Sequence, residues 1–190
     1  MTPLVMDAAQ YIVEPPDMWT SRVVARHKEM APTVVPLPDG GEAWSFEGGA
    51  WSRSLGLEVA AGRSPLEIKA SGHTYGALRK GMYDPTERIE DMRIDGVDAA
   101  CIFPTFGMSV RSISDVDLHL ACVQAYNDGL WEWAQEGDSS RFAPQALMPA
   151  VGYAAAMEEL KRVVKMGYRG IVFSGWPGAG VGPQADEDPF

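Results

Sequence analysis

The sequence of 190 residues predicts an α/β fold built from parallel β/α units. Two observations support this class. From Asp84 onward, segments with helical spacing alternate with short apolar runs of strand length, and each helical segment ends at a glycine. Strands joined through helices in this order pair in parallel through right-handed crossovers. Because the chain is 46% hydrophobic, it can bury the core of one domain, which we expect to span residues 1–190.

The first predicted strand runs from Leu4 to Val13 and is followed by an unusually long connection, residues 20–83. This insertion is irregular and rich in glycine, proline and tryptophan, and a hairpin is expected around Asp39-Gly40-Gly41. Connections of this length in a compact domain are usually functional. We therefore expect residues 20–83 to cover a site or to form an oligomer contact.

The first predicted helix has clear signals at both ends. Asp84 can cap its amino terminus, Pro85 suits the first helical position, and Glu87 lies three residues after the cap. Gly96 can end the helix in a left-handed conformation. The sequence therefore predicts a helix between Asp84 and Gly96.

The remaining elements follow in alternation. A strand from Val97 to Thr105 is predicted to be buried on both faces. The longest helix begins near Ser114 or Asp115 and stops at Gly137. The chain then continues with a strand over Phe142–Ala150, a helix over Tyr153–Met166 with Met157, Leu160 and Val164 on one stripe, and a strand over Tyr168–Ser174. This gives about four parallel strands.

Composition excludes some classes of partner. The net charge of -10 and the pI near 4.7 argue against a nucleic-acid partner, because proteins that bind a phosphate backbone usually carry a basic face. No segment approaches the roughly 18 apolar residues of a membrane span, and the amino terminus lacks the pattern of a leader. With only two cysteines, the chain suits a reducing compartment. We expect a cytoplasmic protein without a membrane partner.

Candidate site residues lie where the strands end, because ligands of parallel α/β folds bind at the carboxyl ends of strands. Thr105, Ser174 and Trp176 are predicted to contact substrate there, although Thr105 and Ser174 could equally satisfy nearby backbone groups. Glu14 follows the first strand. It is a candidate general acid or supporting carboxylate, and the alternative is that it caps the turn made by the two prolines after it.

The insertion contributes two further candidates. Arg53 could bind a substrate carboxylate through two parallel hydrogen bonds, or it could be an exposed arginine packed on Trp51. His73 could reach a site if the insertion folds over it, and the alternative is a loop histidine without a catalytic role. His27 and His119 lie among charged residues and are predicted to be solvated.

Five segments carry a resemblance to a known family. They are E-P-P-D-M-W (Glu14 to Trp19), Y-D-P-T-E-R-I-E-D-M-R-I-D-G-V-D-A (Tyr83 to Ala99), F-P-T (Phe103 to Thr105), A-Y-N-D (Ala125 to Asp128) and M-G-Y-R-G-I-V (Met166 to Val172). In this order they resemble the amidohydrolase-related family, which includes aminocarboxymuconate semialdehyde decarboxylase and aromatic acid decarboxylases. The resemblance implies a (β/α)8 TIM-type barrel, of which this chain is the amino-terminal half. It also implies a divalent metal, usually zinc, and hydrolysis or nonoxidative decarboxylation of small, often aromatic, organic acids.

The metal is the point at which the sequence departs from the family. The resemblance places two ligands at the end of the first strand, and Ala9 and Tyr11 occupy those positions. Zinc prefers imidazole, thiolate or carboxylate, so neither side chain is an ordinary ligand. We therefore expect no metal ligand among these residues and assign Tyr11 a hydrogen-bonding or proton-transfer role. The family's other ligands would follow its later strands, beyond Phe190.

Two functions from different classes remain open. The first is an enzyme half that acts on a small organic acid once the other half is supplied. The second is a catalytically inert relative, or a truncated fragment, that acts only as a structural or binding subunit. Because a half barrel exposes two sheet edges, we expect a homo-oligomer or a complementing subunit in either case.

Overall fold

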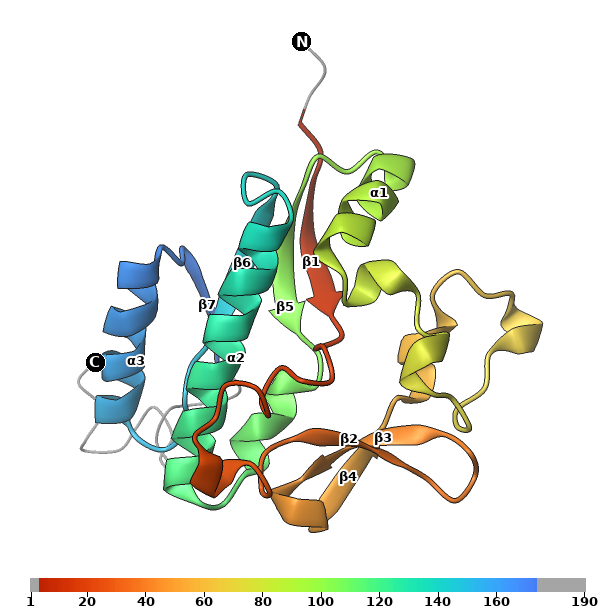
Figure 1. The fold of residues 1–190 in the computed structure, drawn as a ribbon. Coiled ribbons are helices and arrows are strands. Elements are labelled where there is room, and N and C mark those ends of the chain that lie inside the picture. The colour runs from red at the N-terminus through yellow and green to blue at the C-terminus, as the bar shows by residue number, and fades with distance from the viewer. Residues whose placement is uncertain (1–3, 174–190) are drawn as a thin grey trace, which may run out of the picture.

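The computed structural model describes residues 4–173 and contains two sheets (Figure 1). The larger is parallel, has four strands in the order β1-β5-β6-β7, and confirms the predicted class. Its strands are β1 (Met6–Ile12), β5 (Ala99–Pro104), β6 (Phe142–Leu147) and β7 (Gly170–Val172). Three helices connect and cover them: α1 (Pro85–Asp95), α2 (Val116–Glu136) and α3 (Tyr153–Met166). This arrangement corresponds to the first half of a (β/α)8 barrel.

Helix α1 forms where its capping residues predict it. The carboxylate of Asp84 accepts hydrogen bonds from the backbone N–H groups of Thr86 (2.9 Å) and Glu87 (3.0 Å). Gly96 ends the helix at φ 71°, a left-handed conformation that glycine adopts without strain. Local sequence therefore determines both ends of this helix.

Strand β5 is buried on one face rather than on two. Its outward residues Ala100, Ile102 and Pro104 are buried under the helices, whereas alternate residues such as Phe103 are only half-buried. The prediction of burial on both faces is wrong for this strand. The four described strands form an open, concave sheet, and no described strand lies opposite its inner face.

Helix α2 is fixed to β6 by a buried amide. Asn127 Nδ2 donates to the carbonyl of Leu147 (2.9 Å), and Asn127 Oδ1 accepts from the N–H of Leu147 (2.7 Å). The Tyr168 hydroxyl donates to the Asn127 carbonyl (2.6 Å). A single residue of α2 thus holds the carboxyl end of β6 and the segment leading into β7.

His119, on α2, is buried, so the prediction that it is solvated is wrong. Its Nε2 accepts a hydrogen bond from the N–H of Ala150 (3.1 Å). Burial lowers the pKa of His119, which favours the neutral imidazole and suits an accepting nitrogen. The side chain therefore fastens the chain just after β6.

The insertion forms a second, antiparallel sheet in the order β2-β3-β4. Its strands are β2 (Thr33–Pro36), β3 (Glu42–Phe46) and β4 (Trp51–Ser54). The predicted hairpin joins β2 to β3, with Gly40 at φ 80° and the N–H of Leu37 bonded to the Gly41 carbonyl (2.7 Å). Short 3-10 segments make up much of the remaining irregular structure of the insertion: η1 (Ala25–His27), η2 (Glu47–Gly49), η3 (Gly56–Ala60), η4 (Pro65–Glu67), η5 (Tyr75–Ala77) and η6 (Lys80–Met82). A further segment, η7 (Gly107–Ser112), follows β5.

The antiparallel sheet lies at the carboxyl ends of β1 and β5 (Figure 1). Trp44 of β3 packs between Trp19 (ring centroids 4.9 Å apart) and Phe106 (5.8 Å). Glu47 Oε1 accepts from the N–H (2.9 Å) and hydroxyl (2.7 Å) of Ser114, just before α2. The insertion is therefore packed onto the end of the parallel sheet where ligands bind in such folds. Among the helices of residues 4–173, none has the length and apolarity needed to cross a membrane.

Candidate functional site

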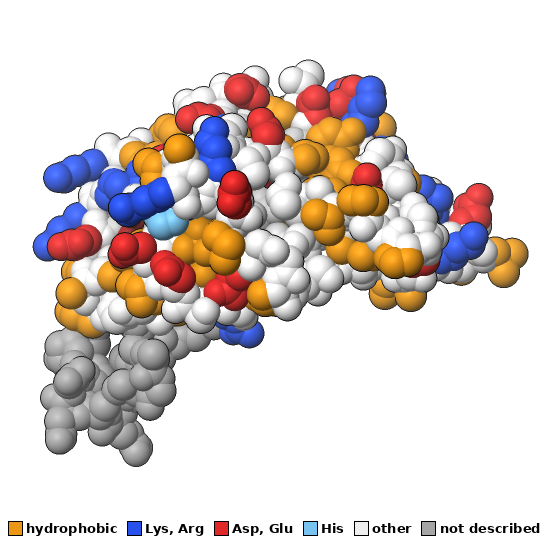
Figure 2. All heavy atoms as spheres, turned by 60° about the horizontal axis from the view of Figure 1, so that its bottom comes forward, with side chains coloured by type: hydrophobic (Ala, Val, Ile, Leu, Met, Phe, Trp, Pro, Cys, Tyr) orange, Lys and Arg blue, Asp and Glu red, His pale blue; other side chains and the backbone are white. Residues whose placement is uncertain are grey.

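Three sequence candidates meet at the carboxyl ends of β1 and β5. Glu14 follows β1, Thr105 follows β5, and Arg53 reaches them from β4 of the insertion. Figure 2 turns this end of the molecule toward the viewer and shows hydrophobic side chains gathered between acidic and basic ones. This end of the parallel sheet is where ligands bind in such folds.

Glu14 is completely buried and binds the loop after β5. Its Oε1 accepts from the N–H groups of Thr105 (3.1 Å) and Gly107 (2.7 Å), and its Oε2 accepts from the N–H of Phe106 (2.9 Å). Burial raises the pKa of Glu14 to about 7, and the three N–H donors act against that rise. Both oxygens are thus engaged in holding this loop.

Two tyrosines lie near Glu14, and the first of them bonds to its backbone. The Tyr75 hydroxyl donates to the Glu14 carbonyl (3.0 Å), and burial, together with the charge of Glu14, raises the pKa of Tyr75. The Tyr126 hydroxyl is buried and makes no hydrogen bond within residues 4–173. A side chain at position 107 would meet Glu14 Oε1 and Tyr126, both at 3.0 Å, so Gly107 lets the loop approach closely. Glu14 therefore positions the loop.

Arg53 lies over the ring of Phe106, with its guanidinium carbon 4.9 Å from the ring centroid, rather than on Trp51. Its Nη1 donates to the Thr105 carbonyl (3.3 Å) and Ser109 Oγ (3.4 Å), and Nη2 lies 3.5 Å from Glu58 Oε1. These contacts are long, and the side chain is 44% exposed. A guanidinium has five N–H donors, so Arg53 retains the capacity to bind a carboxylate.

Tyr11 lies on the concave face of the sheet and is 56% exposed. Its ring packs against that of Phe103, with the centroids 5.8 Å apart. Its carbonyl accepts from Nη2 of the buried Arg88 (2.9 Å), whose Nη1 donates to Gln10 Oε1 (2.9 Å). Arg88 thus fixes the end of β1 and leaves an aromatic surface open beside the rim.

The other candidates are not brought to this group. His73 lies in the insertion, where its Nε2 contacts the Lys69 carbonyl (2.9 Å) and its side chain lines a separate hollow. Ser174 and Trp176 lie outside the described residues. Their predicted substrate contacts remain predictions.

The described side chains do not fit a zinc ion. Within residues 4–173, no group of three or more His, Cys, Asp or Glu side chains is placed to hold a metal. Ala9 and Tyr11 offer no ordinary ligand, and both oxygens of Glu14 bind backbone N–H groups. A metal at this rim would require ligands from outside the described part of the chain.

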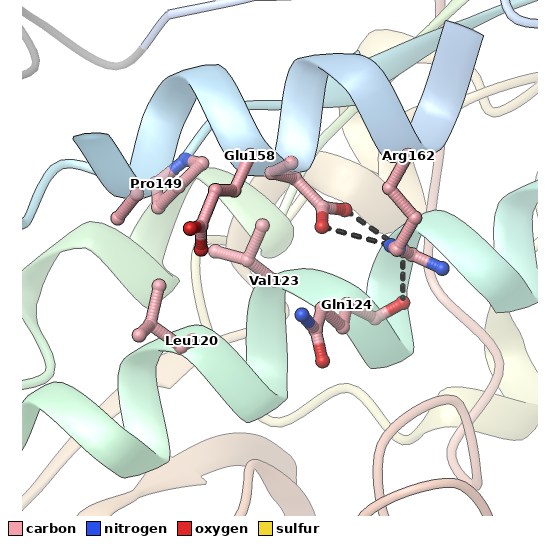
Figure 3. Close-up of a pocket in the computed structure, with 8 residues that line it drawn as sticks. Leu120, Val123, Gln124, Pro149, Glu158 and Arg162 are labelled. Atoms are coloured by element: carbon pink, nitrogen blue, oxygen red, sulfur yellow. Dashed lines mark hydrogen bonds and ion pairs between the residues drawn. The ribbon is translucent and has the colours of Figure 1, made fainter. Parts of the chain in front are cut away.

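A cavity of about 190 Å³ lies between α2 and α3 on the outer, helical layer (Figure 3). Arg162 crosses it and pairs with Asp128 (2.5 Å) and with the buried Glu159 (2.7 Å). Asn127 Nδ2 also donates to Glu159 (2.7 Å). Because the guanidinium of Arg162 is already paired with two carboxylates, the cavity serves helix packing better than ligand binding.

Sequence reasoning missed two residues that build the rim. Ser109 lies beside Arg53. Glu47 bonds the insertion to Ser114, and in the sequence only its place before two glycines distinguishes it. Glu47 has φ 50°, an uncommon backbone conformation for a residue other than glycine. The run E-G-G was the only available pointer to this junction.

Comparison with known proteins identifies the fold. No protein-family model matches the sequence, and no curated protein matches it. Among solved structures, an amidohydrolase from Mycobacterium avium subsp. paratuberculosis superposes with a TM-score of 0.67 at 18% sequence identity. The match covers 91% of this chain and 50% of that one. This chain has the fold of half an amidohydrolase. At this level of identity the similarity establishes the fold alone, and the chain spans about half the length of the protein it matches.

Proposed function

We propose that this chain forms the amino-terminal half of an amidohydrolase-superfamily enzyme, related to aminocarboxymuconate semialdehyde decarboxylase, that acts on a small organic acid. Support comes from the half-barrel similarity to an amidohydrolase and from the cluster at the ends of β1 and β5. The observation that carries the proposal is the partly exposed guanidinium of Arg53, placed beside the loop that Glu14 holds. The reaction is hydrolysis or nonoxidative decarboxylation.

The rim has the chemistry to select an aromatic acid. Arg53 would bind the carboxylate through charge-assisted hydrogen bonds. The rings of Tyr11 and Phe103 pack together at the carboxyl ends of β1 and β5, where an aromatic substrate could stack. The Tyr11 phenol would then hold or transfer a proton at the substrate. When bound, a metal in such enzymes polarises the substrate or activates water.

A second candidate function is binding without turnover. Two observations favour this candidate. Ala9 and Tyr11 occupy the positions where the family resemblance places metal ligands, and residues 4–173 contain no cluster of metal-binding side chains. Such a protein would retain the carboxylate-binding rim of Arg53 as part of a structural or binding subunit. Both candidate functions bind a small organic acid, and only the first converts it.

A substrate panel tests both candidates. Aromatic and semialdehyde acids are incubated with the protein, with and without zinc, while released CO2, hydrolysis products and ligand binding are measured. Turnover that falls in Tyr11→Phe supports the enzyme, and unchanged kinetics in that variant would remove Tyr11 from the mechanism. Binding without turnover supports the second candidate. Neither binding nor turnover across the panel contradicts both.

A further inference from the structure

Glu14 is a buried carboxylate without a cation beside it. Its side chain is fully excluded from solvent, and it makes no ion pair within residues 4–173. A buried carboxylate that lacks a cation costs stability, and proteins place such groups chiefly at functional sites. The presence of a carboxylate here therefore suggests a role beyond packing.

The loop that Glu14 holds is the loop against which Arg53 lies. The Glu14 carboxylate binds the N–H groups of Thr105, Phe106 and Gly107. Arg53 Nη1 donates to the Thr105 carbonyl (3.3 Å), and its guanidinium carbon lies 4.9 Å from the centre of the Phe106 ring. Two of the three residues that Glu14 binds are therefore contacts of Arg53.

A second contact between this loop and Arg53 runs through Trp44. Arg53 lies opposite Trp44 in the pairing of β4 with β3, so this pairing sets the place of its backbone. The Trp44 ring is fully buried and lies 5.8 Å from the ring of Phe106, centroid to centroid. A shift of Phe106 would therefore disturb both the ring that the guanidinium contacts and the ring beside its strand.

The hydrogen bonds that orient the Arg53 guanidinium are individually weak. Each of them is between 3.3 and 3.5 Å long. An arginine that is already oriented loses less conformational entropy when it binds a carboxylate than one that moves freely. The affinity of this guanidinium for a carboxylate thus depends on how firmly the loop is held.

We propose that Glu14 is a positioning residue for carboxylate recognition, which orients Arg53 through the loop after β5. Because both oxygens of Glu14 bind backbone N–H groups, it acts without touching the ligand. This role rests on the proposed function, since it takes Arg53 as the group that binds the acid. It adds a residue, remote from the ligand, on which the affinity for that acid depends.

Calorimetric titration of Glu14→Gln with benzoate tests this role. The substitution keeps the shape of the side chain but replaces one acceptor oxygen with an NH2 group, which cannot accept from an N–H of the loop. We expect benzoate affinity to fall by about threefold or more. Glu159→Gln makes the same change at another buried carboxylate, between α2 and α3, and should leave the affinity unchanged.

A double-mutant cycle separates positioning from a general loss of structure. Arg53→Lys keeps a cation but lacks the planar fork that the loop orients. In that background, Glu14→Gln should lower benzoate affinity by a smaller factor than it does when Arg53 is present. Gly107→Ala places a methyl group 3.0 Å from Glu14 Oε1, which displaces the loop in a second way and should give the same pattern. Circular dichroism and urea unfolding establish that each variant is folded.

An equal fall in affinity in both backgrounds would overturn the proposal, because Glu14 would then act independently of Arg53. Unchanged affinity in Glu14→Gln, alongside weakened binding in Arg53→Ala, would also overturn it and would leave the proposed function intact. If Arg53→Ala bound benzoate as tightly as the unsubstituted protein, the proposed function would fail first and the positioning role with it.

Discussion

At the scale of single residues, Glu14 is the carboxylate whose environment departs most from water. Its two oxygens bind three successive backbone N–H groups, Thr105 to Gly107, that lie more than ninety positions along the chain. The sequence predicts that Glu14 is either a general acid or a cap for the proline turn. In the structure its carboxylate binds the loop after β5 instead of the proline turn. Local sequence could not reveal a partner that distant.

The raised pKa of Glu14 makes stability depend on pH. The folded pKa of about 7 lies above the ordinary 4.5, so between these values the folded state binds more protons than the unfolded state. The stabilising contribution of Glu14 is therefore present below pH 4.5 and is lost as pH rises to 7. From the size of the shift, that loss is about 3 kcal/mol of unfolding free energy.

Urea unfolding at several pH values between 4.5 and 8 measures this effect. The free energy of unfolding of the unsubstituted protein should fall with rising pH relative to that of Glu14→Gln, which cannot titrate. Glu29→Gln, at an exposed position in the insertion, is the control and should follow the unsubstituted protein. Parallel curves for Glu14→Gln and the unsubstituted protein would show that Glu14 titrates normally.

At the scale of elements, sequence predicted best where the signals are local. The bounds of α1 follow from Asp84, Pro85 and Gly96, and the start of α2 follows from Asp115, whose carboxylate accepts from the N–H of Leu118 (2.8 Å). By contrast, the third strand of the insertion, β4, was not predicted. It forms by pairing with β3, and its residues Trp51 to Ser54 have no strong strand pattern of their own.

Asn127 provides a test of how α2 is tied to the sheet. Asn127→Ala would leave the buried N–H and carbonyl of Leu147 without their partner and remove a donor to Glu159. We expect the free energy of unfolding to fall by about 2–4 kcal/mol. Gln124→Ala, at an exposed position on the same helix, should change it by less than about 0.5 kcal/mol. Equal losses in chemical denaturation would contradict the role of the Asn127 amide.

At the scale of the whole molecule, the order of strands and helices was predictable and the assembled site was only partly so. Alternating patterns predict parallel strands, and the carboxyl ends of those strands are where Glu14 and Thr105 lie. Which insertion residue reaches that rim depends on how residues 20–83 fold back. Arg53 does so because β4 pairs with β3, whereas His73 lies elsewhere. Spacing along the sequence did not distinguish the two.

The central claim is that Arg53 gives this rim an affinity for organic carboxylates, and calorimetric titration tests it most directly. Benzoate should bind the unsubstituted protein more tightly than the uncharged benzamide. Arg53→Ala should weaken benzoate binding by about tenfold or more, and Arg53→Lys by less. Arg93→Ala, which removes an exposed arginine paired with Glu90, should leave it unchanged. Equal benzoate affinity in Arg53→Ala and the unsubstituted protein would contradict the account.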